Sequence, residues 1–163
     1  MLRAALAAVA VAALAAPAAE ASSSAAALPW LSATCGGIVA LQHDAAYAKL
    51  ATNPAAARKV AVAVSTDVAR VRKATAATPA VKNGPALASE LGTAARTAQS
   101  ALAQHQRTLG LHATRVAVKA YAASATTVAR TLGSTFLRLL TEHGSPDLDR
   151  AVDQVPTCRV VHG

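Results

Sequence analysis

Two cysteines, Cys35 and Cys158, are the most reactive side chains in the sequence, and their chemistry depends on the compartment. Outside the cytoplasm, two thiols in one chain most simply pair with each other. A lipid anchor on Cys35 would need a small-residue motif directly after an apolar run, whereas Thr34 precedes this cysteine. We therefore predict a disulfide. By closing a loop of about 124 residues, it would stabilise the fold by roughly 4 to 5 kcal/mol.

Histidine and tyrosine side chains form a second candidate site. His43 and Tyr47 have the i, i+4 spacing that places both on one side of a helix, and His105 lies in the apolar stripe of a later segment. Imidazole and phenolate are suitable ligands for haem iron or a divalent metal. One interpretation is therefore a haem or metal carrier in which these residues face inward and converge. The other is that they are ordinary packed side chains with no cofactor.

Positive charge is the third signal. Between residues 49 and 138 there are 13 Lys and Arg residues against Asp67 and Glu90. Such a field attracts anionic partners, but the aromatic platforms on which single-stranded nucleic acid stacks are missing. We expect an anionic envelope polymer or a membrane surface as partner, and no nucleic acid. The candidate contacts lie on the second predicted helix: Arg58, Lys59, Arg70, Arg72 and Lys73. The alternative is that these residues only keep an alanine-rich bundle soluble.

Signatures of catalysis are not found in the sequence. It contains no glycine-rich phosphate loop, no HExxH and no GxSxG motif. Acidic residues cluster near the C-terminus, but their spacing is not that of a calcium-binding loop, and a solvated helix face explains them. These residues are Glu142, Asp147, Asp149 and Asp153. We expect a protein that is not an enzyme.

Composition predicts packed helices around one core. Of 163 residues, 46 are Ala, and the aromatic residues are Trp30, Tyr47, Tyr121 and Phe136. Alanine has the highest helix propensity and is depleted in strands. Because alanine buries little area, the core should be thin and the helices closely spaced. The chain is long enough for a single domain.

Apolar periodicity and breakers predict four helices, over residues 36–52, 54–76, 85–109 and 111–142, with breaks at 53–54, 78–85 and Gly110. Short connections favour an up-down-up-down bundle. That topology brings the start of the first helix and the end of the fourth together, as the disulfide requires. A short fifth helix should follow Ser145 and end at Pro156. One helix running through Gly110 remains an alternative.

The N-terminus has the composition of a signal peptide over residues 1–21, with cleavage after Ala21. An uncleaved anchor is the alternative. Residues 22–34 are expected to be a flexible lead-in and residues 35–163 the bundle domain. No later stretch is expected to span a membrane. The sequence thus predicts a secreted or extracytoplasmic all-α protein with a binding or structural role in the cell envelope; its oligomeric state and ligand stay open.

Overall fold

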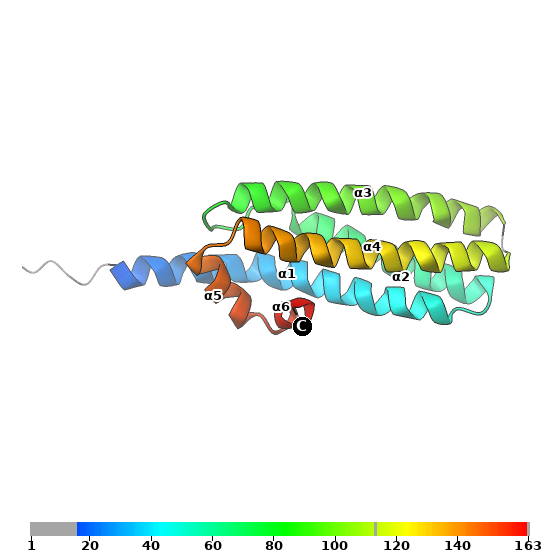
Figure 1. Cartoon of the computed structure of the whole chain (residues 1–163), viewed down its shortest axis with the longest axis horizontal. Coiled ribbons are helices and arrows are strands. Elements are labelled where there is room, and N and C mark those ends of the chain that lie inside the picture. The colour runs from blue at the N-terminus through cyan, green and yellow to red at the C-terminus, as the bar shows by residue number, and fades with distance from the viewer. Residues whose placement is uncertain (1–15, 113, 163) are drawn as a thin grey trace, which may run out of the picture.

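The computed structural model describes the backbone of residues 16–112 and 114–162, and the side chains of residues 24–112 and 114–161. All regular structure within these ranges is helical. The helices are α1 (Ala16–Leu50), α2 (Pro54–Ala74), α3 (Gly84–Leu111), α4 (Arg115–Glu142), α5 (Pro146–Gln154) and α6 (Pro156–His162). The first four form a rod, and α5 and α6 lie against its side (Figure 1). The predicted up-down bundle is confirmed. The predicted signal peptide lies mostly outside the described residues.

The four long helices pack in a ring in which α1 and α3 each contact α2 and α4 and lie diagonally opposite one another. Small residues allow this close packing. A Cβ atom on Gly37 would lie 2.8 Å from Val71 Cγ2, and one on Gly133 would lie 3.0 Å from Gln42 Nε2. The glycines therefore lie where α1 meets α2 and where α4 meets α1, consistent with the thin core that the composition predicts.

Helix starts follow the capping rules that the sequence indicates. The Asn53 side chain accepts a hydrogen bond from Ala56 N (2.9 Å), and Pro54 occupies the first turn of α2. Thr114 accepts one from Ala117 N (3.2 Å) at the start of α4. Such caps satisfy backbone donors that the first turn of a helix leaves unpaired. Apolar side chains on one face of each of α2, α3 and α4 form the core of the bundle.

The expected flexible lead-in at residues 22–34 is wrong, because α1 already begins at Ala16 and not near residue 36. Ala27, Trp30 and Leu31 are buried in this part of the helix. The Trp30 and Phe136 rings lie 6.4 Å apart between their centroids. Since α5 and α6 pack against α1, this segment continues the core.

The break between α3 and α4 lies at residues 112–114 and not at Gly110, which is inside α3. Leu111 consequently ends α3 and is exposed, so the prediction that the fourth helix begins at residue 111 is wrong. The break is set by Thr114, whose side chain caps α4. Two separate helices are nevertheless present, as the bundle requires.

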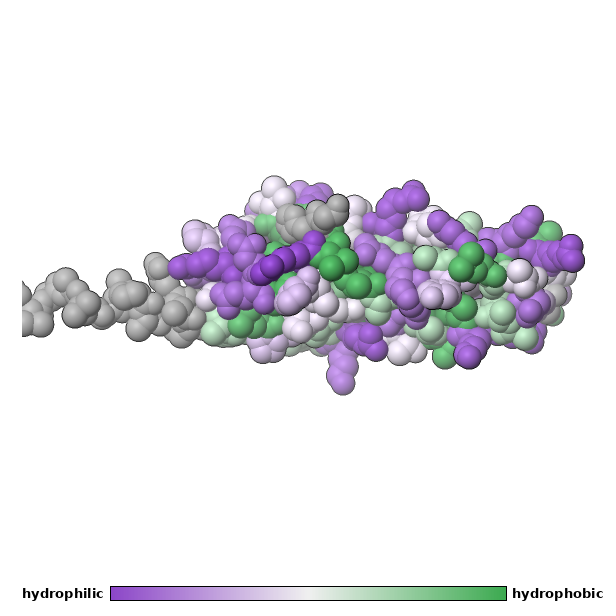
Figure 2. Space-filling view, turned by 90° about the horizontal axis from the view of Figure 1, so that it is seen from below, coloured by the Kyte–Doolittle hydropathy of each residue, from purple (hydrophilic) through white to green (hydrophobic). Residues whose placement is uncertain are grey.

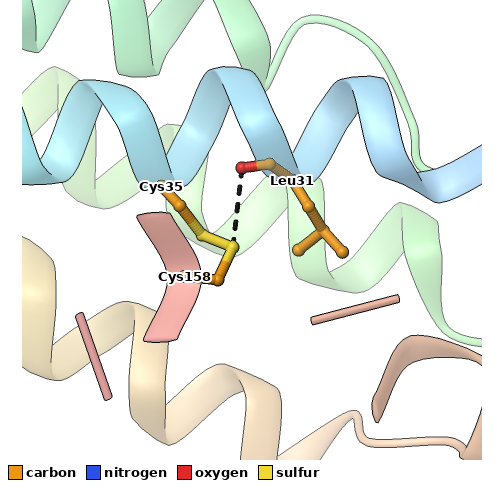
Figure 3. The surroundings of a disulfide bond; sticks show 3 residues. All are labelled: Leu31, Cys35 and Cys158. Carbon is orange, nitrogen blue, oxygen red and sulfur yellow. Dashed lines mark hydrogen bonds between the residues drawn. A yellow bond between two sulfur atoms is a disulfide. The ribbon is translucent and has the colours of Figure 1, made fainter. Parts of the chain in front are cut away.

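The C-terminal segment carries Cys158 to Cys35. Ser145 caps α5 through Leu148 N (3.2 Å), which confirms the short fifth helix. Pro156 ends it as expected and also begins α6, a helix that was not predicted. The two cysteines form a disulfide with a Cα–Cα distance of 5.0 Å, and both are buried (Figure 3). Cys158 Sγ lies 3.7 Å from the Leu31 carbonyl oxygen. A buried disulfide indicates an oxidising environment.

One helix of the described chain, over Ser24–Leu50, is long and apolar enough to cross a membrane by length and composition. Residues 22–43 contain no Asp, Glu, Lys or Arg, so charge alone does not exclude this stretch, and the expectation that no later segment spans a membrane stays a prediction. In the structure this part of α1 packs against α2, α4, α5 and α6, and half of its most apolar window is buried. These contacts are those of a core helix in a bundle.

Candidate functional site

The three candidate haem or metal ligands do not converge. His43 and Tyr47 are neighbours on α1, with ring centroids 4.7 Å apart, but their exposed fractions are 65% for the His43 side chain and 52% for Tyr47. His105 lies on α3, which is diagonal to α1. The expectation that His43 faces inward is wrong. The tyrosine in the core is Tyr121, whose hydroxyl donates to the Ala61 carbonyl (3.4 Å) and whose pKa is raised by burial.

His43 belongs instead to a charged group between α1 and α2. Its Nδ1 lies 3.0 Å from Asp44 Oδ1, and Asp44 interacts with Asp67 on α2. Asp67 is only 4% exposed, and Arg70 donates a hydrogen bond to its Oδ1 (3.1 Å) while its Oδ2 has no protein partner. Burial first, and then Asp44, raises the pKa of Asp67 to about 6, against the opposing effect of Arg70. The Asp44 carboxyl group on α1 thus disfavours ionisation of the Asp67 carboxyl group on α2.

The burial of Asp67 was not predicted from the sequence. Its position carried a signal, because Asp67 is three residues after Val64 and four before Val71, on the apolar stripe of α2. A carboxyl group on such a stripe is buried and must either bind a proton or find a partner. Asp67 was instead counted only as one of the two acidic residues in a basic stretch, so its place on the apolar face was overlooked.

The end of the rod formed by the α1–α2 and α3–α4 connections, here called the loop end, comprises residues 47–59 and 105–119. Arg58 on α2 donates a hydrogen bond to the Gly110 carbonyl on α3 (3.3 Å), which joins these two helices close to the two connections. Neither segment contains Asp or Glu. Together they expose six cationic side chains: Lys49, Arg58, Lys59, Arg107, Arg115 and Lys119. The loop end is therefore strongly positive, and Lys49 and Lys119 line one shallow hollow there.

Apolar side chains are exposed at the same end. Leu50, Leu111 and Val116 are 71%, 78% and 77% exposed, and Tyr47 is half exposed. Hydrophobic and hydrophilic residues both reach the surface at this end in the space-filling view (Figure 2). The described side chains include only two other large apolar residues with comparable exposure, Val62 and Val160. Large exposed apolar groups concentrated in one place mark an interaction surface.

The five basic residues predicted as contacts on α2 fall into two groups. Arg58 and Lys59 belong to the loop end. Arg70, Arg72 and Lys73 lie near the other end of α2, where Arg70 pairs with Asp67 and Arg72 donates to Gln99 Oε1 (2.9 Å). Arg70 and Lys73 also line a hollow of about 400 Å³ together with Trp30. The predicted residues are all exposed but do not form a single surface.

The chain matches no family model, and neither a curated protein nor a solved structure is significantly similar to it. Functional inference therefore depends on the chemistry of the sites themselves.

A groove of about 570 Å³ between α3 and α4 is lined mainly by alanine and threonine, with Glu90 and Arg138 among its charged residues. Near the ends of the same helices, Glu90, Glu142 and His143 bring three potential metal-ligand atoms within 4.8 Å of one another. His143 Nε2 already contacts Glu90 Oε1 (2.9 Å), and Arg138 pairs with Glu142. These contacts explain the cluster without a metal ion: the three side chains are paired within the protein, and His143 links the end of α4 to Glu90 on α3.

Proposed function

We propose that this protein is an exported, non-catalytic helical bundle that associates with the cell envelope by binding an anionic component through its loop end. Export is supported by the buried disulfide, which is typical of oxidising compartments, and by the signal-like composition of the N-terminal segment. A structural role without binding would leave the concentration of charge at one end unexplained.

Charge segregation is the observation that carries the proposal. Six exposed cations gather at the loop end, and no acidic residue lies between positions 45 and 66 or between 91 and 141. A solubilising surface needs charge but not charge of one sign at one place. Single-sign charge raises the local concentration and association rate of oppositely charged partners. An anionic ligand is therefore favoured over the haem or metal alternative, because His43 and Tyr47 are exposed on α1 and His105 lies on the diagonal helix α3.

The test measures binding of the purified protein to phosphatidylglycerol vesicles and to immobilised anionic cell-wall polymer, at low and high salt. A loop-end variant with Lys49→Gln, Lys59→Gln and Lys119→Gln is compared with a matched variant carrying Arg72→Gln, Lys73→Gln and Lys82→Gln. Both remove three exposed positive charges. Since each cation near an anionic surface contributes about fivefold in affinity, the loop-end variant should bind roughly a hundredfold more weakly to at least one material.

The control variant should retain most of the affinity of the unmodified protein, and high salt should weaken binding by all of them. Equal losses in the two variants would mean that net charge, and not the loop end, determines binding. Failure to bind either material at low salt would overturn the proposed function.

A further inference from the structure

We infer that the anionic component is the surface of a phospholipid bilayer, on which the loop end docks with Leu50 and Leu111 inserted among the headgroups. This inference rests on the proposed function and specifies its partner. It is carried by the combination of exposed apolar side chains with acid-free positive charge at one end of the molecule.

The position of the apolar side chains favours a lipid partner over a polymer. Leu50 ends α1 and Leu111 ends α3, so both lie where their helices reach the end of the rod. The hydrogen bond from Arg58 on α2 to the Gly110 carbonyl on α3 links the two helices at this end. A hydrated acidic polymer gives no environment in which a leucine side chain loses contact with water. A bilayer interface does, and the free energy gained grows with the apolar area buried there.

Cations lie close to these leucines in the chain. Lys49 directly precedes Leu50, while Arg107 and Arg115 flank Leu111 four residues away on either side. Peripheral membrane contacts use this combination of apolar groups in the interface and Lys or Arg at the phosphates. Tyr47, which is half exposed next to Lys49 and Leu50, adds a side chain whose apolar ring and polar hydroxyl suit the headgroup region.

The positive charge of the loop end favours anionic over zwitterionic lipid. The potential of a membrane surface containing anionic lipid decays within about 8 Å at physiological ionic strength. Lys49, Arg107 and Arg115 lie at helix ends within four residues of a leucine, so they come within that range when the leucines reach the headgroups. Zwitterionic lipid would supply the apolar environment without this attraction, so the two contributions can be measured separately.

The decisive experiment compares Leu50→Ser/Leu111→Ser with the control Val62→Ser/Val160→Ser. Both variants replace two exposed large apolar residues, but Val62 and Val160 lie outside the loop end. Sedimentation is measured with phosphatidylglycerol vesicles, phosphatidylcholine vesicles and anionic cell-wall polymer. The protein should prefer phosphatidylglycerol strongly. The leucine variant should lose about tenfold or more of that affinity and bind polymer as before, while the valine variant changes neither.

A Leu50→Trp variant gives an independent readout, because an indole that enters the headgroup region emits at shorter wavelength. Its emission should shift with phosphatidylglycerol vesicles and stay constant with polymer, whereas Trp30 is buried and serves as constant background.

Unchanged vesicle affinity of the leucine variant, or the lack of an emission shift, would overturn lipid insertion. Binding to polymer but not to vesicles would also overturn it while leaving the proposed function intact. Binding to neither material would overturn both.

Discussion

The two halves of the rod are fastened in different ways. In the disulfide half, formed by residues 24–38 of α1 with α5 and α6, α1 is packed against additional helices and joined to α6 by Cys35–Cys158. At the loop end only two short connections close the bundle, and large apolar side chains remain exposed. The chain thus concentrates covalent and packing contacts in one half and leaves apolar and cationic side chains exposed at the other end.

Charge follows the same division. Arg150 pairs with Asp147 and Arg138 with Glu142 near the disulfide half, so positive charge there is balanced by nearby acids. The loop end contains cations without any acid in its two segments. Like charges at close range destabilise a fold slightly. The loop end therefore departs from the most stable distribution of charge, and such departures are typical of functional sites.

Removing the disulfide tests the disulfide half of the rod and should have the largest effect on stability. The double variant Cys35→Ala/Cys158→Ala should lower the free energy of unfolding by about 4 to 5 kcal/mol, because the unfolded chain regains the entropy of an open loop. Urea denaturation followed by circular dichroism measures this, and reduction of the unmodified protein should reproduce it. Equal midpoints for the oxidised and reduced protein would contradict the importance assigned to this contact.

The buried carboxyl group of Asp67, which lies between the two halves, should make stability depend on pH. Because the pKa of Asp67 is raised from 3.8 to about 6 by burial and by Asp44, the folded state binds a proton more tightly than the unfolded chain. The resulting stabilisation is complete below the unfolded pKa and is lost as the pH rises through about 6. The free energy of unfolding should therefore fall by roughly 2 to 3 kcal/mol between about pH 4 and pH 7.

Urea denaturation at several pH values tests this with Asp67→Asn, which should remove most of the slope. Asp153→Asn, an exposed carboxyl group on α5, is the control and should keep it. A slope that survives in Asp67→Asn would assign the pH dependence to other groups.

Two adjacent glycines on α1 distinguish tight packing from open surface. A Cβ atom at Gly37 would meet Val71 Cγ2 at 2.8 Å, whereas nothing lies within 4 Å of one at Gly36. Val71 is buried and β-branched, so it cannot easily move aside. Gly37→Ala should destabilise by about 1 to 2 kcal/mol, and Gly36→Ala should stabilise by roughly 0.5 to 1 kcal/mol. Thermal melting of both variants measures the difference, and equal shifts would contradict the close approach of α1 and α2.

The architecture could be predicted because its signals are local or follow from connectivity. Stripes such as Val64, Val68 and Val71 repeat at helical spacing, and Asn53 and Ser145 cap the helices that follow them. The disulfide was predicted from two cysteines in an exported chain, and the up-down topology, which brings the two cysteines to the same end, agreed with it. The first part of α1 was missed because its serines and Pro29 suggested a linker, although Ala27, Leu31 and later residues continue the buried stripe.

The candidate haem site failed because periodicity does not fix the rotation of a helix. Two stripes were available on α1, one containing His43 and Leu50 and the other containing Ile38, Leu41, Ala45 and Ala48. Packing against α2 and α4 buries the second. The loop end, in contrast, was accessible from the sequence, because two acid-free segments meet at one end of an up-down bundle. The exposure of Leu50 and Leu111 could not be predicted from the sequence, because it depends on where each helix ends and how it is rotated.

The smallest expected effect concerns two lysines at the loop end, whose removal should raise stability while it weakens binding. Lys49 and Lys119 line the same hollow without an acidic residue in it, so Lys49→Gln/Lys119→Gln should raise the free energy of unfolding by roughly 0.5 kcal/mol at low salt. The gain should vanish at high salt, where repulsion is screened. Thermal melts at two salt concentrations measure it, with Lys82→Gln, which is outside the loop end, as the control. A loss of stability in the double variant would mean that these lysines contribute to the fold. A gain accompanied by weaker vesicle binding is the outcome expected of a surface maintained for its partner at the expense of stability.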